Sequence, residues 1–220
     1  MREILVCFAV KEEATQFKQK AHSIPGVKIL LTGIGRRNAE TASKAALARQ
    51  KPSFVFTCGF AGGLNPELTS GAVVCSAESD VQSVVASAGA KPARFHCSER
   101  IVTTAAQKRE LYQSTGADAV EMESQFIRAV CCEHNIPSAT VRVILDTADE
   151  DLPLDFNQLM NSRQEMSYAR LALALLKTPT TIPALLRLQR QSQAAGHRLA
   201  QILGSCVLGV TEFPDGRARV

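Results

Sequence analysis

Two acidic segments, each directly after a short apolar run, constrain the fold of this chain more than any other feature. Residues 141–145 form a strand-like run (Val-Arg-Val-Ile-Leu) that stops at Asp146. Earlier in the chain, an Ala-Val pair leads into Glu121 and Glu123, and a helical pattern of apolar residues follows. Acids at the carboxyl ends of strands in an α/β protein lie where ligands usually bind. Acids are also favoured in the first turn of a helix, so capping explains any single one of them equally well.

Strand-like and helix-like patterns alternate along the rest of the chain. We predict strands at residues 4–10, 27–31, 53–58, 71–76 and 138–145, and helices at residues 14–21, 39–49, 105–113, 164–176 and 182–203. A glycine-rich loop is predicted at 59–64, and residues 80–86 are predicted to be strand or loop. The alternation predicts a single-domain three-layer α/β/α fold with a mixed, mostly parallel central sheet. This domain is expected to span residues 1–213, with a C-terminal helical part at about 162–203 and a flexible tail at 214–220.

Composition argues against several classes of protein. The chain has 220 residues, 45% of them hydrophobic, which suits one sizeable core. Its net charge is only +4 and no Lys/Arg block interleaves with aromatic residues, so nucleic-acid binding is not indicated. The seven cysteines lack framework or metal-ligand spacing, and we therefore expect reduced thiols, no metal and a cytoplasmic location. The first apolar run is too short to span a membrane.

Four groups of residues fall at predicted strand ends. They are Glu12 with Glu13, the glycines of 59–63, Glu121 with Glu123, and Asp146. The chain has no Gly-x-Ser-x-Gly elbow and no Walker loop. Separated carboxylates can activate water and protonate a leaving group, and a carboxylate also accepts the two hydroxyls of a sugar diol. The residues alone therefore predict a carboxylate-rich α/β site of a hydrolase or a transferase.

Four segments resemble signatures of the nucleoside phosphorylase and nucleosidase superfamily, in that family's order. Ala-Val-Glu-Met-Glu-Ser at 119–124 is similar to the family's V-E-M-E-[SA], and Arg-Val-Ile-Leu-Asp-Thr-Ala-Asp at 142–149 to its R-x-I-S-D-x-A-D. Thr-Cys-Gly-Phe-Ala-Gly-Gly-Leu at 57–64 is similar to T-G-S-A-G-G-L, and Ala-Val-Lys-Glu-Glu-Ala at 9–14 to A-M-E-E-E-[VA]. The resemblance implies the nucleoside phosphorylase-like fold and a small-molecule purine nucleoside as substrate.

The resemblance also implies roles for the acids. Glu123 would bind the ribose 2′- and 3′-hydroxyls, with Met122 packed under the sugar and Glu121 in support. Asp146 would be the general acid that protonates the purine at N7 as the bond to C1′ stretches. Glu13 would orient or deprotonate the attacking water.

Two further groups follow from the same resemblance. The loop near the nucleophile or an anion would consist of Gly59, Phe60, Ala61 and Gly62. The base would be flanked by Phe156, Ile101 and Val102.

The sequence departs from the family pattern at three positions. Thr57 stands where the phosphorylases keep a phosphate-binding arginine, and Phe60 replaces the serine of the glycine loop. Burying a phosphate dianion without a cation is very costly, so we favour water as the nucleophile and expect a nucleosidase without a cofactor. Arg36 and Arg37 keep a phosphorylase with phosphate as co-substrate as the alternative. Leu145 replaces the serine before the catalytic Asp. The substitutions at Phe60 and Leu145 keep a catalytically inactive nucleoside-binding protein as a third possibility.

The C-terminal region suggests a branch of the family. Residues 179–203 resemble the C-terminal part of the phosphorylase-like proteins of hopanoid biosynthesis, which implies adenosylhopane as a substrate. Residues 166–211 contain no acid, against five basic residues: Arg170, Lys177, Arg187, Arg190 and Arg198. A basic amphipathic helix can lie on an anionic membrane, which predicts a peripheral membrane contact, or can simply pack on the sheet. The family resemblance further implies a homo-oligomer, for which we expect a dimer.

Overall fold

The structure, a computed structural model, describes residues 2–211, apart from the side chains of residues 79 and 80. The tail predicted at 214–220, and the last two residues of the predicted domain, lie outside the described residues. Within them the chain forms the α/β/α architecture that the alternating patterns predict.

The strands and helices are as follows. The strands are β1 (Ile4–Phe8), β2 (Val27–Leu31), β3 (Phe54–Gly63), β4 (Val73–Ala77), β5 (Lys91–Pro92), β6 (Phe95–Cys97), β7 (Ala119–Glu121) and β8 (Ser138–Asp146). The helices are α1 (Lys11–Ala21), α2 (Arg36–Arg49), α3 (Ser79–Ser87), α4 (Ala105–Thr115), α5 (Ser124–Glu133), α6 (Phe156–Leu159), α7 (Tyr168–Lys177) and α8 (Ile182–Thr211), with a 3₁₀ turn at Pro179–Thr181.

The central sheet has the order β2-β1-β3-β8-β4-β5. The pairs β1–β2, β1–β3, β3–β8 and β4–β5 are parallel, while β4 runs antiparallel to β8. The short strand β7 pairs antiparallel with the end of β3 and parallel with β6. The prediction of a mixed, mostly parallel sheet is therefore confirmed. The carboxyl ends of β1, β3 and β8 meet at one edge because these strands share one direction.

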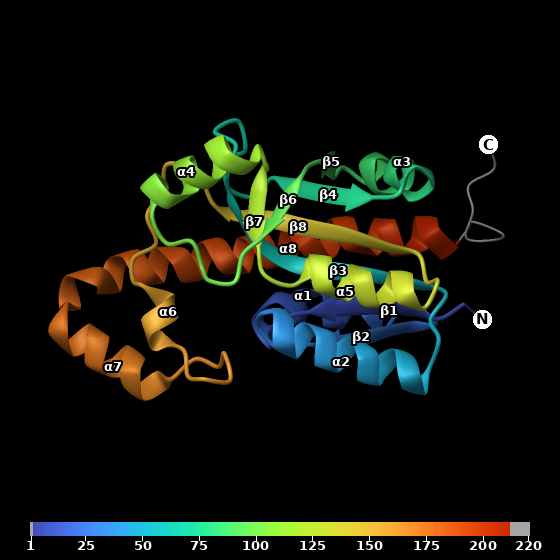
Figure 1. The fold of residues 1–220 in the computed structure, drawn as a ribbon, viewed down its shortest axis with the longest axis horizontal. Coiled ribbons are helices and arrows are strands. Elements are labelled where there is room, and N and C mark those ends of the chain that lie inside the picture. The colour runs from blue at the N-terminus through green and yellow to red at the C-terminus, as the bar shows by residue number, and fades with distance from the viewer. Residues whose placement is uncertain (1, 212–220) are drawn as a thin grey trace.

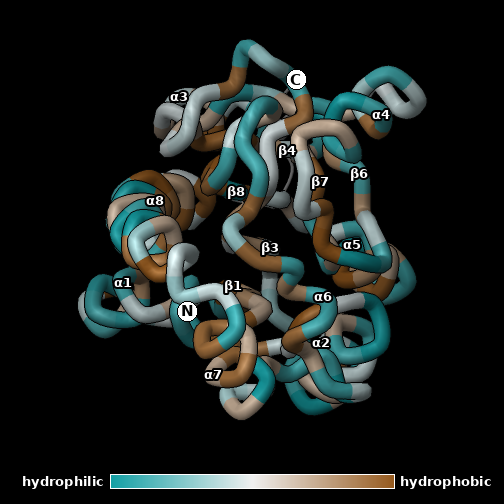
Figure 2. Tube along the Cα trace, turned by 90° about the vertical axis from the view of Figure 1, so that its left-hand side faces the viewer, coloured by the Kyte–Doolittle hydropathy of each residue, from teal (hydrophilic) through white to brown (hydrophobic). Residues whose placement is uncertain are grey.

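Helices cover both faces of the sheet, so its central strands are buried on both sides. On one face α1 and α8 pack on β1 and β3 through Phe17, Leu199 and Leu203. On the other face α2 and α5 pack through Leu47 and Ile127. Figure 2 looks along the strands from their carboxyl ends and shows the two helical layers on opposite sides of β1 and β3.

Three local predictions are wrong. The glycine segment at 59–63 is not a loop but the second half of β3, because its backbone pairs with β8 on one side and, at Gly62 and Gly63, with β7 on the other. Residues 80–86 lie in α3, where Val81, Val84 and Val85 have helical spacing and Val85 enters the core. The strand predicted at 4–10 ends at Phe8.

Both C-terminal helices also differ from their predicted bounds. Helix α7 begins at Tyr168 rather than at 164, since Gln164 has a φ of 60° and Ser167 accepts a hydrogen bond from the Arg170 amide as the cap. Helix α8 continues to Thr211 rather than 203, since Cys206 and Val207 extend its buried face. Among the described residues no single helix is long and apolar enough to cross a membrane; α7 and the segment Pro179–Thr211 meet that test only as a pair bent by 106°.

Candidate active site

The carboxyl ends of β1, β3 and β8 bring the predicted acids to one edge of the sheet. Glu13 lies in the first turn of α1 after β1, and Asp146 is the last residue of β8. Glu121 ends β7, and Glu123 precedes α5. All four carboxylates are buried, although ionised groups are rarely buried without partners. Their partners therefore decide what each of them can do.

Glu13 is held by three backbone amides. Its Oε2 accepts hydrogen bonds from Ala9 N (3.1 Å) and Val10 N (3.3 Å), and its Oε1 accepts one from Phe60 N (2.8 Å). Burial raises the pKa of Glu13, while Arg142 and the three amides oppose this rise. The last acid of the Lys-Glu-Glu run therefore bridges β1 and the glycine segment of β3, which is where the resemblance to the family puts the nucleophile.

Arg142, in the middle of β8, is the cation at the centre of the cluster. Its side chain is only 1% exposed, and its Nη2 lies 2.6 Å from Glu121 Oε2 and 3.4 Å from Glu123 Oε2. Nη1 also donates to the Cys58 carbonyl at 3.2 Å. One guanidinium thus serves the carboxylates of two strands, and it also acts electrostatically on Glu13.

Glu121 is a structural acid. Besides Arg142 it accepts hydrogen bonds from the Glu123 amide (3.0 Å), the Ser124 amide (2.8 Å) and the Ser124 hydroxyl (2.8 Å). Burial opposes its ionisation, but Arg142 and these bonds outweigh burial and lower the pKa of Glu121. Capping of α5 is therefore the right interpretation for this acid, and its oxygens are fully engaged.

Glu123 has fewer partners. Its Oε1 accepts a hydrogen bond from Gly35 N at 2.9 Å, and its Oε2 has the longer contact with Arg142. Burial, with Glu121 and Glu13 nearby, raises the pKa of Glu123 to about 7 against the pull of Arg142. A poorly compensated carboxylate of this kind has free capacity to accept hydrogen bonds from a ligand.

Asp146 pairs with a buried lysine that the sequence analysis did not single out. Lys108 Nζ, on α4, lies 2.5 Å from Asp146 Oδ2, and its side chain is 0% exposed. Burial raises the pKa of Asp146, and the ammonium of Lys108 opposes that rise. The acid predicted to protonate the base is therefore part of an ion pair.

The glycines of β3 leave room for these side chains. A Cβ on Gly59, whose φ is 149°, would overlap Glu13 Oε1 and the guanidinium of Arg142. A Cβ on Gly62 would stand 3.2 Å from Val120 Cγ1 and 3.4 Å from Asp146 Oδ2. The segment Gly59, Phe60, Ala61 and Gly62 thus lies between Glu13 and Asp146, as a strand rather than as a loop.

The remaining predicted residues border the same edge of the sheet. Met122 is buried and its terminal carbon is 4.0 Å from the position of a Cβ on Gly35. The Asn157 side chain, next to Phe156 on α6, exchanges two hydrogen bonds with the Ile101 backbone (2.9 and 2.8 Å). Val102 packs in the cluster that contains Val120. The predicted base-flanking segments are therefore joined to each other.

Two contributors to this site were not predicted from the sequence: Lys108 and the role of Arg142. Arg142 lies within a quoted motif, so its position after one apolar residue of a buried strand could have marked it. Lys108 gives no such signal, because α4 is largely polar and one lysine in it resembles any solvated one. No group of three His, Cys, Asp or Glu side chains among residues 2–211 could hold a metal ion.

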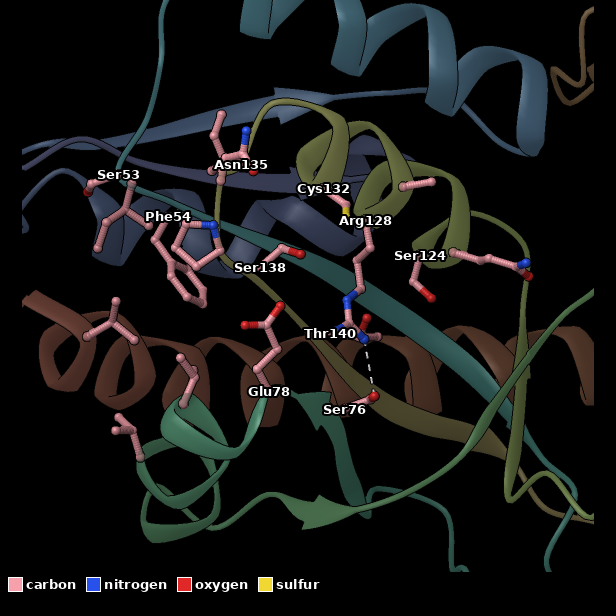
Figure 3. A pocket seen from close by; sticks show the side chains of 18 of the residues that line it. Ser53, Phe54, Ser76, Glu78, Ser124, Arg128, Cys132, Asn135, Ser138 and Thr140 are labelled. Atoms are coloured by element: carbon pink, nitrogen blue, oxygen red, sulfur yellow. Dashed lines mark hydrogen bonds between the residues drawn. The ribbon is translucent and has the colours of Figure 1, made fainter. Parts of the chain in front are cut away.

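A separate depression of about 1110 Å³ lies between α3 and α5, over the first half of β8. Figure 3 shows Arg128 reaching across it toward Ser76, whose hydroxyl accepts a hydrogen bond at 3.2 Å. Glu78 is its one acidic lining residue among those the structure describes. The depression therefore lacks the paired carboxylates found at the strand ends.

Comparisons with known proteins agree with the fold and the motifs. Residues 90–177 match the model of the phosphorylase superfamily. The 5'-methylthioadenosine/S-adenosylhomocysteine nucleosidase of Anoxybacillus flavithermus is 29% identical over 170 residues, 61% of this chain and 73% of the relative. The enzyme of the same name from Glaesserella parasuis is 28% identical over 185 residues, 68% of this chain and 80% of the relative.

Solved structures show the same fold at low identity. The Campylobacter jejuni enzyme of that name aligns with a TM-score of 0.71 at 13% identity, over 94% of this chain and 99% of the other. The futalosine hydrolase of Helicobacter pylori aligns with a TM-score of 0.68 at 16% identity, over 94% and 97%. The match to the family model and the two relatives support a place for the chain in the nucleoside phosphorylase and nucleosidase superfamily. Within that superfamily it is similar to the methylthioadenosine/adenosylhomocysteine nucleosidases.

Proposed function

We propose that this protein is a nucleosidase that hydrolyses the N-glycosidic bond of an adenine-type nucleoside. The observation that carries the proposal is that Glu13 and Asp146 converge on the glycine segment of β3, while Arg142, which a Cβ on Gly59 would also overlap, contacts Glu123. The nucleosidase names of the two relatives support it.

The three carboxyl groups divide the chemistry. Protonated Asp146 donates its proton to N7 of the purine, and the C1′–N9 bond breaks with its electron pair moving to the base. The sugar acquires oxocarbenium character, and Glu123 accepts hydrogen bonds from its 2′- and 3′-hydroxyls. Glu13 orients the water that attacks C1′ and takes its proton. Its raised pKa makes it a stronger base than an exposed glutamate.

Several cations near the site are already paired with carboxylates, which supports water rather than phosphate as the nucleophile. Arg142 is shared between Glu121 and Glu123, and Lys108 is paired with Asp146. Arg36, which kept phosphorolysis open, pairs with Glu40 at 3.0 Å and lies over the Phe126 ring. A phosphate dianion would have to draw on charges already in use. Phosphorolysis remains the second candidate, and Arg37 is exposed on the same turn of α2.

We propose that the substrate carries an apolar group on its 5′ side. Among the candidate substrates, adenosylhopane has the largest such group. Apolar side chains on α7 and at the start of α8 support this, since Tyr168, Leu173, Leu176, Ile182 and Leu186 are all exposed. Figure 1 shows α6 and α7 at the end of the molecule to which the carboxyl ends of β1 and β3 point. A small 5′ group, as in methylthioadenosine, is the alternative.

The same surface supports two proposals about partners. Exposed apolar residues in an acid-free, basic stretch fit a peripheral contact with an anionic membrane. They also fit burial against a second copy in the homodimer that we expect from the family resemblance. A cytoplasmic location remains a prediction from the sequence.

The decisive experiment is a base-release assay over a panel of nucleosides, with and without phosphate. The panel would contain adenosine, methylthioadenosine, adenosylhomocysteine and an adenosine carrying a long alkyl group at C5′. We expect adenine and the free sugar to form without phosphate. Strict phosphate dependence with a sugar 1-phosphate product would instead establish a phosphorylase.

Variants separate catalysis from binding. Asp146→Asn should lower kcat by about 10²–10⁴-fold, since general acid catalysis contributes on that scale. Full activity of this variant would show that Asp146 is not the acid. Binding of nucleosides by the native chain without turnover of any of them would establish a binding protein that has lost catalysis.

A further inference from the structure

Lys108 is a fully buried lysine with three oxygen atoms around its ammonium group. Besides Asp146 Oδ2, its Nζ lies 2.7 Å from the Thr147 carbonyl oxygen and 2.6 Å from the Glu150 carbonyl oxygen. Two of the three ammonium hydrogens are donated to these carbonyls, and the ammonium charge pairs with Asp146. Buried lysines are rare unless paired, and this one is paired with the proposed general acid.

The two backbone contacts fix the ammonium on the acid's own chain. Thr147 follows Asp146 directly, and the turn that it begins is closed by a hydrogen bond from the Glu150 amide to the Thr147 carbonyl (3.2 Å). Lys108 therefore links α4, the end of β8 and the turn after it. Because the side chain of Lys108 and the carboxyl group that it contacts are both buried, the carboxyl group of Asp146 has little freedom to rotate.

The residue directly before Asp146 suggests why the contact between Lys108 and Asp146 matters. The family resemblance puts a serine before the catalytic Asp, and this chain has Leu145 there. Leu145 cannot donate a hydrogen bond to the carboxyl group, whereas Lys108 approaches it from another helix.

We propose that Lys108 is a positioning residue for Asp146, which holds Oδ2 so that the other oxygen carries the proton that goes to the base. The inference rests on the proposed nucleosidase function. After proton transfer, the carboxylate that remains on Asp146 is stabilised by the ammonium. Lys108 keeps its own protons throughout, so the proton balance is that of Asp146 and the purine alone.

The charges that face Asp146 define a pH test. They are Lys108 from α4, which favours the carboxylate, and Glu150 from the turn after β8, which disfavours it. An opposite charge in contact lowers a carboxyl pKa by about 1–3 units. Removing the ammonium should therefore raise the pKa of Asp146 and keep it protonated to higher pH.

The first arm measures that pKa without reference to activity. Carboxyl ¹³C signals of labelled aspartate are titrated in the native chain, Lys108→Met and Lys108→Gln, with Asp146→Asn to assign the signal. We expect the pKa of Asp146 to rise by about 1–3 units in both variants. Lys108→Gln retains donors for the two carbonyls, so it serves if Lys108→Met fails to fold. An unchanged pKa would overturn the proposal.

A measurement on the native chain needs no Lys108 variant at all. The ammonium ¹⁵N signal of Lys108 should be protected from exchange and should shift as Asp146 titrates. An ammonium signal that does not respond to this titration would also overturn the proposal.

The second arm measures base release against pH. In Lys108→Gln we expect the alkaline limb of kcat to move to higher pH, a roughly tenfold lower plateau, and a KM within about twofold of the native value. Lys44→Met, a change at an exposed lysine of α2, should leave the profile as in the native chain. A Lys108→Gln profile that coincides with the native one would contradict the assignment.

The two arms also keep the two proposals apart. If the native chain releases no base from any nucleoside, the proposed function fails, while the ¹³C titration still decides whether Lys108 controls Asp146. If the native chain is active and the titration shows no shift, the inference about Lys108 fails alone.

Discussion

At the residue scale, three glutamates share one buried arginine and yet differ in their chemistry. Glu121 has Arg142, two amides and a hydroxyl as partners, so it stays ionised and holds α5. Glu123 has one amide and a longer contact with Arg142, so its charge is poorly compensated. Glu13 has three amides but lies farther from neutralising charge. The number and kind of hydrogen-bond partners, rather than the residue type, therefore distinguish the supporting Glu121 from Glu123 and Glu13, which we propose to take part in the reaction.

Glu123→Gln should stabilise the protein above neutral pH while lowering its base-release activity. The pKa of Glu123 is about 7 in the folded protein against 4.5 as its ordinary value. Between these values only the folded state keeps the proton, so the unfolding free energy falls as pH rises through this window, by about 3 kcal/mol for a fully buried group. In Glu123→Gln this fall should disappear, leaving the variant about 1–3 kcal/mol more stable at pH 8. Urea unfolding at several pH values measures it.

Glu121→Gln is the matched control for that prediction. Its folded pKa is lowered, so Glu121 contributes stability that is present above pH 4.5 and is lost as pH falls through its folded pKa. Removing its charge leaves Arg142 less compensated, and we expect a loss of about 3 kcal/mol at pH 7. Equal changes of the unfolding free energy in Glu121→Gln and Glu123→Gln at pH 8 would refute the distinction between a well-compensated Glu121 and a poorly compensated Glu123. In the base-release assay, Glu123→Gln should lose about a hundredfold in kcat/KM.

Gly59→Ala tests the close approach at the centre of β3. The new methyl group would overlap Glu13 Oε1 and Arg142, and the φ of 149° disfavours any side chain. We expect a loss of about 1–3 kcal/mol, as for other overpacked positions, together with loss of activity. Gly71→Ala is the comparison, since Gly71 also has a positive φ but its Cβ would meet nothing within 4 Å. Strain alone would make the two variants equally destabilised, and this outcome would rule out the overlap as the cause.

At the element scale, α8 is one helix with two environments. Its second half is buried against α1 and the sheet, where Leu199 and Leu203 are in the core. Its first half carries exposed apolar side chains, including Leu186. The sequence predicted a helix here but ended it at residue 203, directly before Gly204, and a second glycine, Gly209, lies farther along the helix. Both are kept in the helix by packing, which local propensity does not register.

Leucine substitutions along α8 should follow this division. Leu199→Ala and Leu203→Ala remove fully buried side chains, and each should lower the unfolding free energy by about 2–5 kcal/mol. Leu186→Ala, on the same helix and half-exposed, should change it by at most about 0.5 kcal/mol. Thermal or urea unfolding compares the three. A large loss of unfolding free energy in Leu186→Ala would mean that the apolar face of the first half of α8 is covered, by a second copy or by another partner.

At the scale of the whole molecule, the proposed site draws on nearly the full sheet. The segment that matches the superfamily model, residues 90–177, supplies Glu121, Glu123 and Asp146 but neither Glu13 nor Gly59. Glu13 lies in the first turn of α1, directly after β1, and Gly59 lies in β3, which pairs with both β1 and β8. The site therefore exists only when the two halves of the chain fold together.

The distribution of charge predicts behaviour on membranes. Residues 166–211 have no acid, and Leu176 is 81% exposed between basic residues. We expect the protein to sediment with vesicles of anionic lipid and not with neutral ones, with binding that weakens as salt is added. Leu173→Gln with Leu176→Gln should reduce this binding and leave stability unchanged. A variant pair that binds as well as the native chain would contradict the membrane contact, and concentration-dependent sedimentation lost in the pair would assign the face to a dimer.

The sequence by itself determined the fold class, most of the strands and helices, and the acids at the strand ends. It could do so because strand ends and motif spacing are local properties of the chain. Glu13, Glu123 and Asp146 could therefore be located, and the family resemblance already gave Glu121 a supporting role. The hydrogen bonds that account for this supporting role required the structure.

Tertiary structure alone decided which cation each acid has and what the glycines are for. Lys108 is 38 residues from Asp146 along the chain and signals nothing there, yet burial leaves the two groups only each other and two carbonyls. The glycine segment reads as a loop from its composition, but pairing with β8 and β7 makes it a strand. Both outcomes depend on contacts between distant segments, because desolvation and strand pairing act on neighbours in space rather than in sequence.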